Sequence, residues 1–166
     1  MATVTNITYS ADTALTWTDN TITAGSWVNS ANFDNATLKF VDVLAGGFIG
    51  IDSTTAVVGE TLDVYVMANY SDTATDIGGA RDAAYAFDGL QVPDTDFIVA
   101  NTTWMTSIGL HATETTDMNY HWGPVGIAQF FGGIMPKDFN ILIHNNTSAD
   151  IDAGDINLIG ITYTHT

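Results

Sequence analysis

The sequence contains no cysteine, only three basic residues, only three prolines and no long hydrophobic run. Without cysteine, the chain has no disulfide, no thiolate nucleophile and no thiolate ligand for a metal. Three basic against nineteen acidic residues give a formal net charge of −16 at pH 7, which repels nucleic-acid phosphates and anionic membranes. No apolar run approaches the ~18 residues of a membrane-spanning helix. We therefore expect a soluble domain with no nucleic-acid and no membrane partner.

What the sequence does contain is typical of an all-β protein. Nearly all of the acidic residues are aspartates, and Glu60 and Glu114 are the only glutamates. Asp, Asn, Thr, Ser and Gly all favour turns or strands over helix interiors. The chain has 166 residues, the usual size of one domain, and a chain of this length buries roughly 70% of its unfolded surface. The first residues lack the basic and apolar segments of a secretory signal, so either a signal has been removed or none existed.

The clearest predicted strand covers residues 61–69. Leu62, Val64 and Val66 alternate there with residues of other types, which is the period of two expected where one face of a sheet is buried. We expect Leu62, Val64 and Val66 to face the core. Gly46 and Gly47, by contrast, predict a loop before this strand.

Further strands are predicted at 36–44, 139–144 and 156–164. The last two are separated by a turn at 145–148 and a polar loop to residue 155, so they predict an antiparallel pair that closes a sheet. Many short strands, close turn signals and no alternation of strands with helices favour an antiparallel two-sheet sandwich of jelly-roll-like type.

The domain organisation predicted from this pattern has two parts. Residues 1–35 are expected to form an N-terminal arm or extra strands, and residues 36–166 the β-sandwich domain. Residues 70–79 form a long polar break, which predicts a loop. Only 82–90 and 125–131 are candidates for short helices, so little helix is expected.

One acidic cluster is a weak candidate for a metal site. Asp150, Asp152 and Asp155 fall within six residues, and hard cations prefer carboxylate oxygens on a turning backbone. However, the twelfth position of a calcium loop that starts at Asp150 is Ile161 rather than a bidentate glutamate. An Asp-rich turn is the favoured interpretation, so no metal and no cofactor is expected.

The sequence carries no recognisable catalytic constellation. It has no nucleophile elbow, phosphate-binding loop or dinucleotide-binding turn, and its histidines lack metal-binding spacing. A site built from histidines of several subunits remains open, but we expect no enzyme. The tryptophans and tyrosines fit a sugar-stacking platform, a sandwich core or a subunit interface equally well. The four histidines that lack metal-binding spacing are His111, His121, His144 and His165.

The C-terminal part of the chain resembles a class of small virion proteins of tailed bacteriophages. The resemblance is strongest over 135–151, where a Pro, a Lys-x-Phe strand and an Asn-Asn-Thr turn occur in this order before a final apolar strand. It extends to 59–67, 72–79 and the segment from residue 110 onward, roughly the last two-thirds of the chain. These motifs describe turns and strands rather than a reaction. The residues that carry the strongest part are Pro136, Lys137, Phe139, Asn145, Asn146 and Thr147.

The resemblance implies a β-sandwich or jelly-roll protein on the outer surface of a phage capsid, of the decoration or cement type. Its implied partners are the major capsid protein and further copies of itself, which we expect to form a homotrimer. Two alternatives remain: a tail or fibre accessory domain that binds glycans, and a calcium-dependent adhesion or carbohydrate-binding module. Residues 1–35 match no pattern of the class, and such arms often carry the attachment. The apolar candidates for the interface there, each of which is equally suited to burial in the core, are Ile7, Tyr9, Trp17, Trp27 and Phe33.

Overall fold

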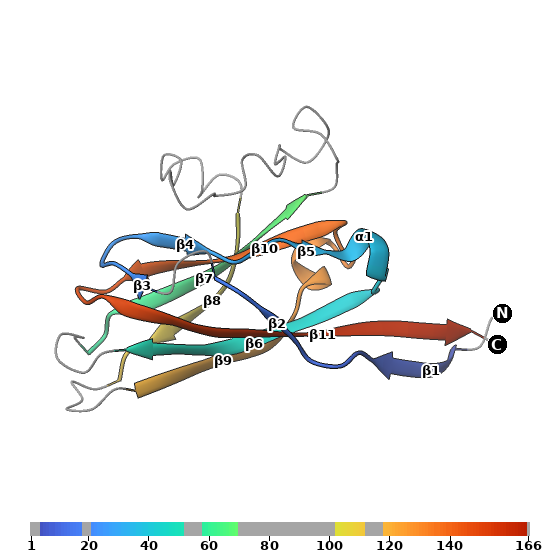
Figure 1. Ribbon diagram of the computed structural model, residues 1–166, viewed down its shortest axis with the longest axis horizontal. Helices are drawn as coiled ribbons and strands as arrows, with labels where there is room; N and C mark the ends of the chain where they lie inside the picture. The colour runs from blue at the N-terminus through green and yellow to red at the C-terminus, as the bar shows by residue number, and fades with distance from the viewer. Residues whose placement is uncertain (1–3, 18–20, 52–57, 70–101, 112–117, 166) are drawn as a thin grey trace.

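The structure is a computed structural model that describes residues 4–17, 21–51, 58–69, 102–111 and 118–165. Within these residues, two antiparallel β-sheets pack against each other (Figure 1). This architecture confirms the predicted fold class, an all-β two-sheet sandwich. No helix in the described part of the chain is both long and apolar enough to cross a membrane.

The first sheet has six strands among the described residues, and its central strand is β11 (Ile151–His165). One side of β11 pairs with β6 (Asp42–Ile51), which pairs in turn with β9 (Met118–Gly126). The other side of β11 pairs with three short strands, β1 (Val4–Tyr9), β2 (Thr13–Leu15) and β3 (Thr21–Ile22).

The second sheet has five strands in the described ranges, with β10 (Asp138–Asn146) near its centre. One side of β10 pairs with β7 (Thr61–Asn69), and β7 pairs with β8 (Thr103–Gly109). The other side pairs with β4 (Trp27–Asn29) and β5 (Phe33–Asp34). Residues 4–34 thus supply strands to both sheets.

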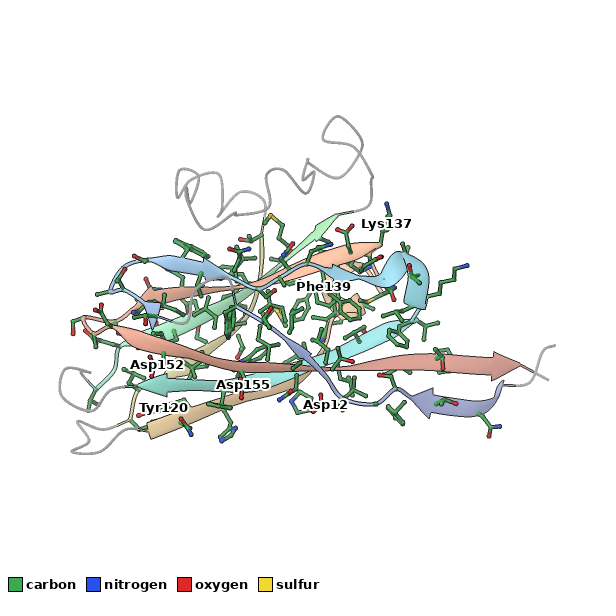
Figure 2. The ribbon with its side chains drawn as sticks, viewed as in Figure 1. Asp12, Tyr120, Lys137, Phe139, Asp152 and Asp155 are labelled. Carbon is green, nitrogen blue, oxygen red and sulfur yellow. The ribbon has the colours of Figure 1, made fainter. Side chains whose placement is uncertain are left out.

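The core lies between the two sheets and is built from alternate residues of their strands. Leu62, Val64 and Val66 of β7 are fully buried, as the period-two pattern predicts. Figure 2 shows Phe139 of β10 between the two layers, and this side chain is also 0% exposed. Other large side chains with almost no exposure are Ile49, Ile141, Ile143, Ile156 and Leu158.

The strand predicted over 36–44 is wrong in its first half, because a helical turn, α1 (Asn35–Leu38), occupies it. The carboxylate of Asp34 accepts a hydrogen bond from the backbone N–H two residues later, at 2.8 Å, and caps this turn. The Asn35 side chain then bonds both the N–H (2.8 Å) and the carbonyl (3.1 Å) of Phe40. These side-chain bonds replace the bonds of a strand.

The loop predicted at Gly46 and Gly47 is also wrong, since both residues lie inside β6. A Cβ atom at Gly47 would collide with the backbone oxygen of Asp155 on the neighbouring strand. Glycine at this position therefore marks a close approach of two strands rather than a break between them.

The polar loop predicted before residue 156 is also wrong, because β11 already begins at Ile151. The register between β11 and β6 shifts between Asp152 and Asp155, which is the signature of a β-bulge. Gly154 lies in this bulge with a φ of 67°, and a Cβ atom there would collide with the backbone oxygen of Phe48. The bulge keeps this polar sequence paired to β6.

Gly154→Ala is expected to lower the free energy of unfolding by about 2–3 kcal/mol, from a left-handed backbone plus a steric collision. The measurement is urea denaturation. Gly132→Ala is the matched control, because Gly132 has a φ of 69° but no atom within 4 Å of an added Cβ. It should cost about 1 kcal/mol. Equal losses in the two variants would mean that the bulge relaxes without cost.

The predicted antiparallel pair of 139–144 and 156–164 is wrong, because β10 and β11 lie in different sheets. The link between them turns inward at Ala149, which is buried. The Asn145 side chain donates hydrogen bonds to the backbone oxygens of Ile22 (3.0 Å) and Ala149 (2.8 Å). The buried side-chain amide thus supplies hydrogen bonds to backbone oxygens at this corner. In a hairpin, pairing between the two strands would have supplied them.

Helix is scarce in the described residues, as predicted. Of the segment 125–131, η1 (Ala128–Phe131) forms a short 3-10 turn, while Val125 and Gly126 still belong to β9. The predicted helix over 82–90 and the predicted loop over 70–79 lie outside the described residues.

Candidate functional site

β1 and the C-terminal part of β11 form a two-stranded ribbon that extends beyond the rest of the sandwich (Figure 1). The pairing of β11 with β6 ends where Ile161 lies opposite Asp42. Past this point β11 continues beside β1, with Ile7 opposite Tyr163. An isolated two-stranded ribbon is at best marginally stable in water, so the projecting part has little support beyond its own pairing.

The ribbon has one apolar and one polar face, because side chains alternate along each strand. Ile7 pairs with Tyr163 and Tyr9 with Ile161, which places these four residues on one face. We call them the apolar ribbon face. Ile7 is 54% exposed, Tyr9 59% and Tyr163 48%, so large apolar side chains are left in water. The opposite face carries the polar residues Asn6, Thr8 and Thr162.

A shallow groove of about 380 Å³ lies on the outer face of the first sheet. Ile159 lines it and points to the same side as Ile161, two residues further along β11. Asp12, which follows β1, supplies a carboxylate to its rim (Figure 2). The groove therefore continues the apolar ribbon face onto the sandwich. Its apolar lining includes Leu44, Phe48, Pro124 and Ile159.

The structure separates the five interface candidates of the N-terminal segment by exposure. Ile7 and Tyr9 are exposed on the ribbon. Phe33 is buried, with its ring centroid 5.0 Å from that of Phe139. Trp27 is 8% exposed, and Trp17 is half-buried against the core. Of these five candidates, only Ile7 and Tyr9 therefore offer a large accessible surface in the single chain.

A second exposed surface lies on the outer face of the second sheet. Trp104 of β8 is 54% exposed, and its indole N–H donates a hydrogen bond to the Ser107 hydroxyl at 3.2 Å. The Ser107 hydroxyl in turn hydrogen-bonds one carboxylate oxygen of Asp63, and the side-chain amide of Asn146 donates to the other. We call these four residues the indole–carboxylate patch.

The indole–carboxylate patch adjoins a cluster of aromatic rings. Trp27 stacks on His144 with ring centroids 4.3 Å apart and lies 5.0 Å from the Tyr65 ring. Burial lowers the pKa of His144 below 6.5, against the opposing effect of the nearby Asp63 carboxylate. Burial, helped by Asp63, raises the pKa of the Tyr65 phenol above 10. At neutral pH, both rings beside Asp63 are therefore uncharged.

The sequence candidates for metal binding do not converge. The Asp150 carboxylate accepts a hydrogen bond from the backbone N–H of Ala24 at 3.0 Å. Asp152 and Asp155 are exposed on either side of the bulge in β11 (Figure 2). In the described part of the chain, no three His, Asp or Glu side chains are placed to hold an ion.

Of the residues that form these surfaces, the sequence indicates Tyr163 and Trp104 only as part of its general set of aromatic residues, and it gives no signal for Asp63. Tyr163 lies in the predicted C-terminal strand, and its alternation with Ile161 is a signal that sequence analysis can use. Trp104 and Asp63 lie on different strands, and their approach depends on the register of β7 against β8. No known protein family matches this sequence, and no curated protein matches it either.

Proposed function

We propose that this chain is a structural protein of a phage particle that binds the outer surface of the capsid, as decoration or cement proteins do. The observation that supports this proposal most directly is the apolar ribbon face, which projects from the sandwich with three exposed large side chains. Exposed apolar groups of this kind gain free energy when a partner removes them from water. The proposed role requires no catalysis and no cofactor.

In this proposal the partner of the apolar ribbon face is the major capsid protein. The chain binds the assembled shell and not its dissociated subunits, so by mass action its binding stabilises the shell against the pressure of packaged DNA. A homotrimer would multiply weak contacts through avidity. The net charge of −16 keeps the protein from binding the packaged DNA itself.

The test is to mix the purified protein with capsids that lack it, and to measure binding by sedimentation and the temperature at which the capsids release DNA. We expect saturable binding and a higher release temperature. Ile7→Asp and Tyr163→Asp should each weaken binding about 10–100-fold, since burial of one such side chain contributes about 1.5–3 kcal/mol.

Thr8→Asp is the matched control for these variants. It adds the same charge to the same ribbon but on the polar face, so binding should change less than about 3-fold. If Thr8→Asp weakens binding as much as Ile7→Asp, charge or ribbon order, and not apolar contact, controls attachment. If the unaltered protein does not bind capsids, the capsid role is wrong and tail or glycan binding becomes the leading alternative.

A further inference from the structure

The indole of Trp104 is held against the outer face of the second sheet. Its N–H group reaches the hydroxyl of Ser107, three residues further along the same strand. For this bond to form, the ring has to extend along β8 instead of standing away from the sheet. With 54% of the residue exposed, the indole offers an oriented aromatic surface to solvent.

Among the residues that the structure describes, the hydrogen-bond partners of the Asp63 carboxylate, which lies near this indole, are uncharged. Its two oxygens accept from the Ser107 hydroxyl and the Asn146 amide, and each oxygen retains capacity for a further donor. His144 lies directly opposite Asp63 in the strand pairing. Because burial lowers the pKa of His144, this ring does not offset the carboxylate charge at neutral pH.

We propose that the indole–carboxylate patch is a binding site for an arginine side chain of a protein partner. A guanidinium group is planar and positively charged, so it can stack on the indole while its N–H groups donate to Asp63. In the resulting hydrogen bonds both the donor and the acceptor are charged, whereas a neutral hydroxyl would donate to Asp63 without a positive charge of its own.

The charge of the whole chain favours the same ligand. A protein with a net charge of −16 attracts basic partners and repels anionic ones. A neutral sugar is able to stack on Trp104 and to donate hydroxyl hydrogen bonds to Asp63, but it lacks the positive charge that an arginine brings to this carboxylate. The site lies on the second sheet, whereas the apolar ribbon face belongs to the first, so this inference does not depend on the proposed capsid function.

The experiment titrates the ¹⁵N-labelled protein with the peptide acetyl-Gly-Arg-Gly-amide and follows the indole N–H signals by NMR. Trp104→Phe identifies the Trp104 signal. We expect this signal to move saturably, and the citrulline analogue, which keeps the shape but lacks the charge, to bind at least about 5-fold more weakly. Asp63→Asn should weaken binding of the arginine peptide at least about 5-fold.

Asp155→Asn is the control, because it removes the same charge from an exposed site on the other sheet. It should change the affinity less than about 2-fold. Equal effects of Asp63→Asn and Asp155→Asn, or equal binding of the citrulline peptide, would overturn the arginine site. So would a Trp104 signal that saturates with methyl glucoside and not with the arginine peptide.

Discussion

Phe139→Ala is expected to lower the free energy of unfolding by about 3–5 kcal/mol. Phe139 is fully buried near the middle of the sandwich, and its ring packs against that of Phe33 at 5.0 Å. Truncation removes the transfer free energy of a whole ring and leaves a cavity that two paired sheets cannot close. Since domains of this kind are stable by about 5–15 kcal/mol, the loss should be visible as a large shift of the urea midpoint.

Ile134→Ala is the control for this prediction, because Ile134 is 68% exposed. Removal of its side chain should change the free energy of unfolding by less than about 0.5 kcal/mol. The slope of the unfolding free energy against urea concentration should stay the same in both variants. A loss below about 1.5 kcal/mol for Phe139→Ala would mean that the core is not packed around this ring.

The parts of the fold that sequence analysis predicted correctly are those in which local pattern and tertiary environment agree. In β7, Leu62, Val64 and Val66 alternate with other residues, and all three are fully buried. Such alternation is a direct consequence of the strand geometry and of one-sided burial. The composition, rich in Asp, Asn, Thr and Gly, predicted the all-β class for the same local reason.

The errors occur where a distant part of the chain decides the outcome. Residue type alone predicts a loop at Gly47, but Asp155 of β11 lies so close that only glycine fits. The pairing of β10 with β11 was inferred from the short link between them. Buried hydrogen bonds from Asn145 to Ile22 and Ala149 instead direct the chain into the other sheet, and no local pattern contains this information.

The candidate surfaces, too, could be predicted only in part from the sequence. Ile7 and Tyr9 were among the predicted interface residues, and they are exposed on the ribbon; the same list contained Phe33, which packs in the core. Large apolar side chains are equally suited to a core and to an interface. Which role each has depends on whether another strand covers it, and that is known only once the strand pairing is known.

The corner between the two sheets depends on one buried polar side chain, Asn145. It is fully buried, and its amide N–H groups donate to two backbone oxygens. Its carbonyl oxygen accepts from the backbone N–H (3.0 Å) and the hydroxyl (2.7 Å) of Thr147. The residues that bond to the Asn145 side chain are themselves buried. Water can therefore replace a lost hydrogen bond only if the corner between the sheets opens.

Asn145→Asp is therefore expected to lower the free energy of unfolding by at least about 3 kcal/mol at pH 7.5. The substitution replaces a donor by a charged acceptor that faces the backbone oxygens of Ile22 and Ala149. Burial without a cation raises the pKa of the new carboxyl group in the folded state, because it disfavours the charged form. The folded variant then binds a proton more readily than the unfolded chain does, so its stability should recover as the pH falls through the folded-state pKa.

The measurement is urea denaturation of Asn145→Asp and of Asn119→Asp at a series of pH values between 7.5 and 4.5. Asn119 is exposed, so its substitution adds the same charge at a surface site. Stability of the control relative to the unaltered chain should change by less than about 0.5 kcal/mol over this range. The difference between the two variants should shrink as the pH falls, since a protonated carboxyl group again offers a donor to one of the two carbonyls. A difference that stays constant with pH would show that the new carboxylate has reached solvent, and that the corner opens when Asn145 is lost.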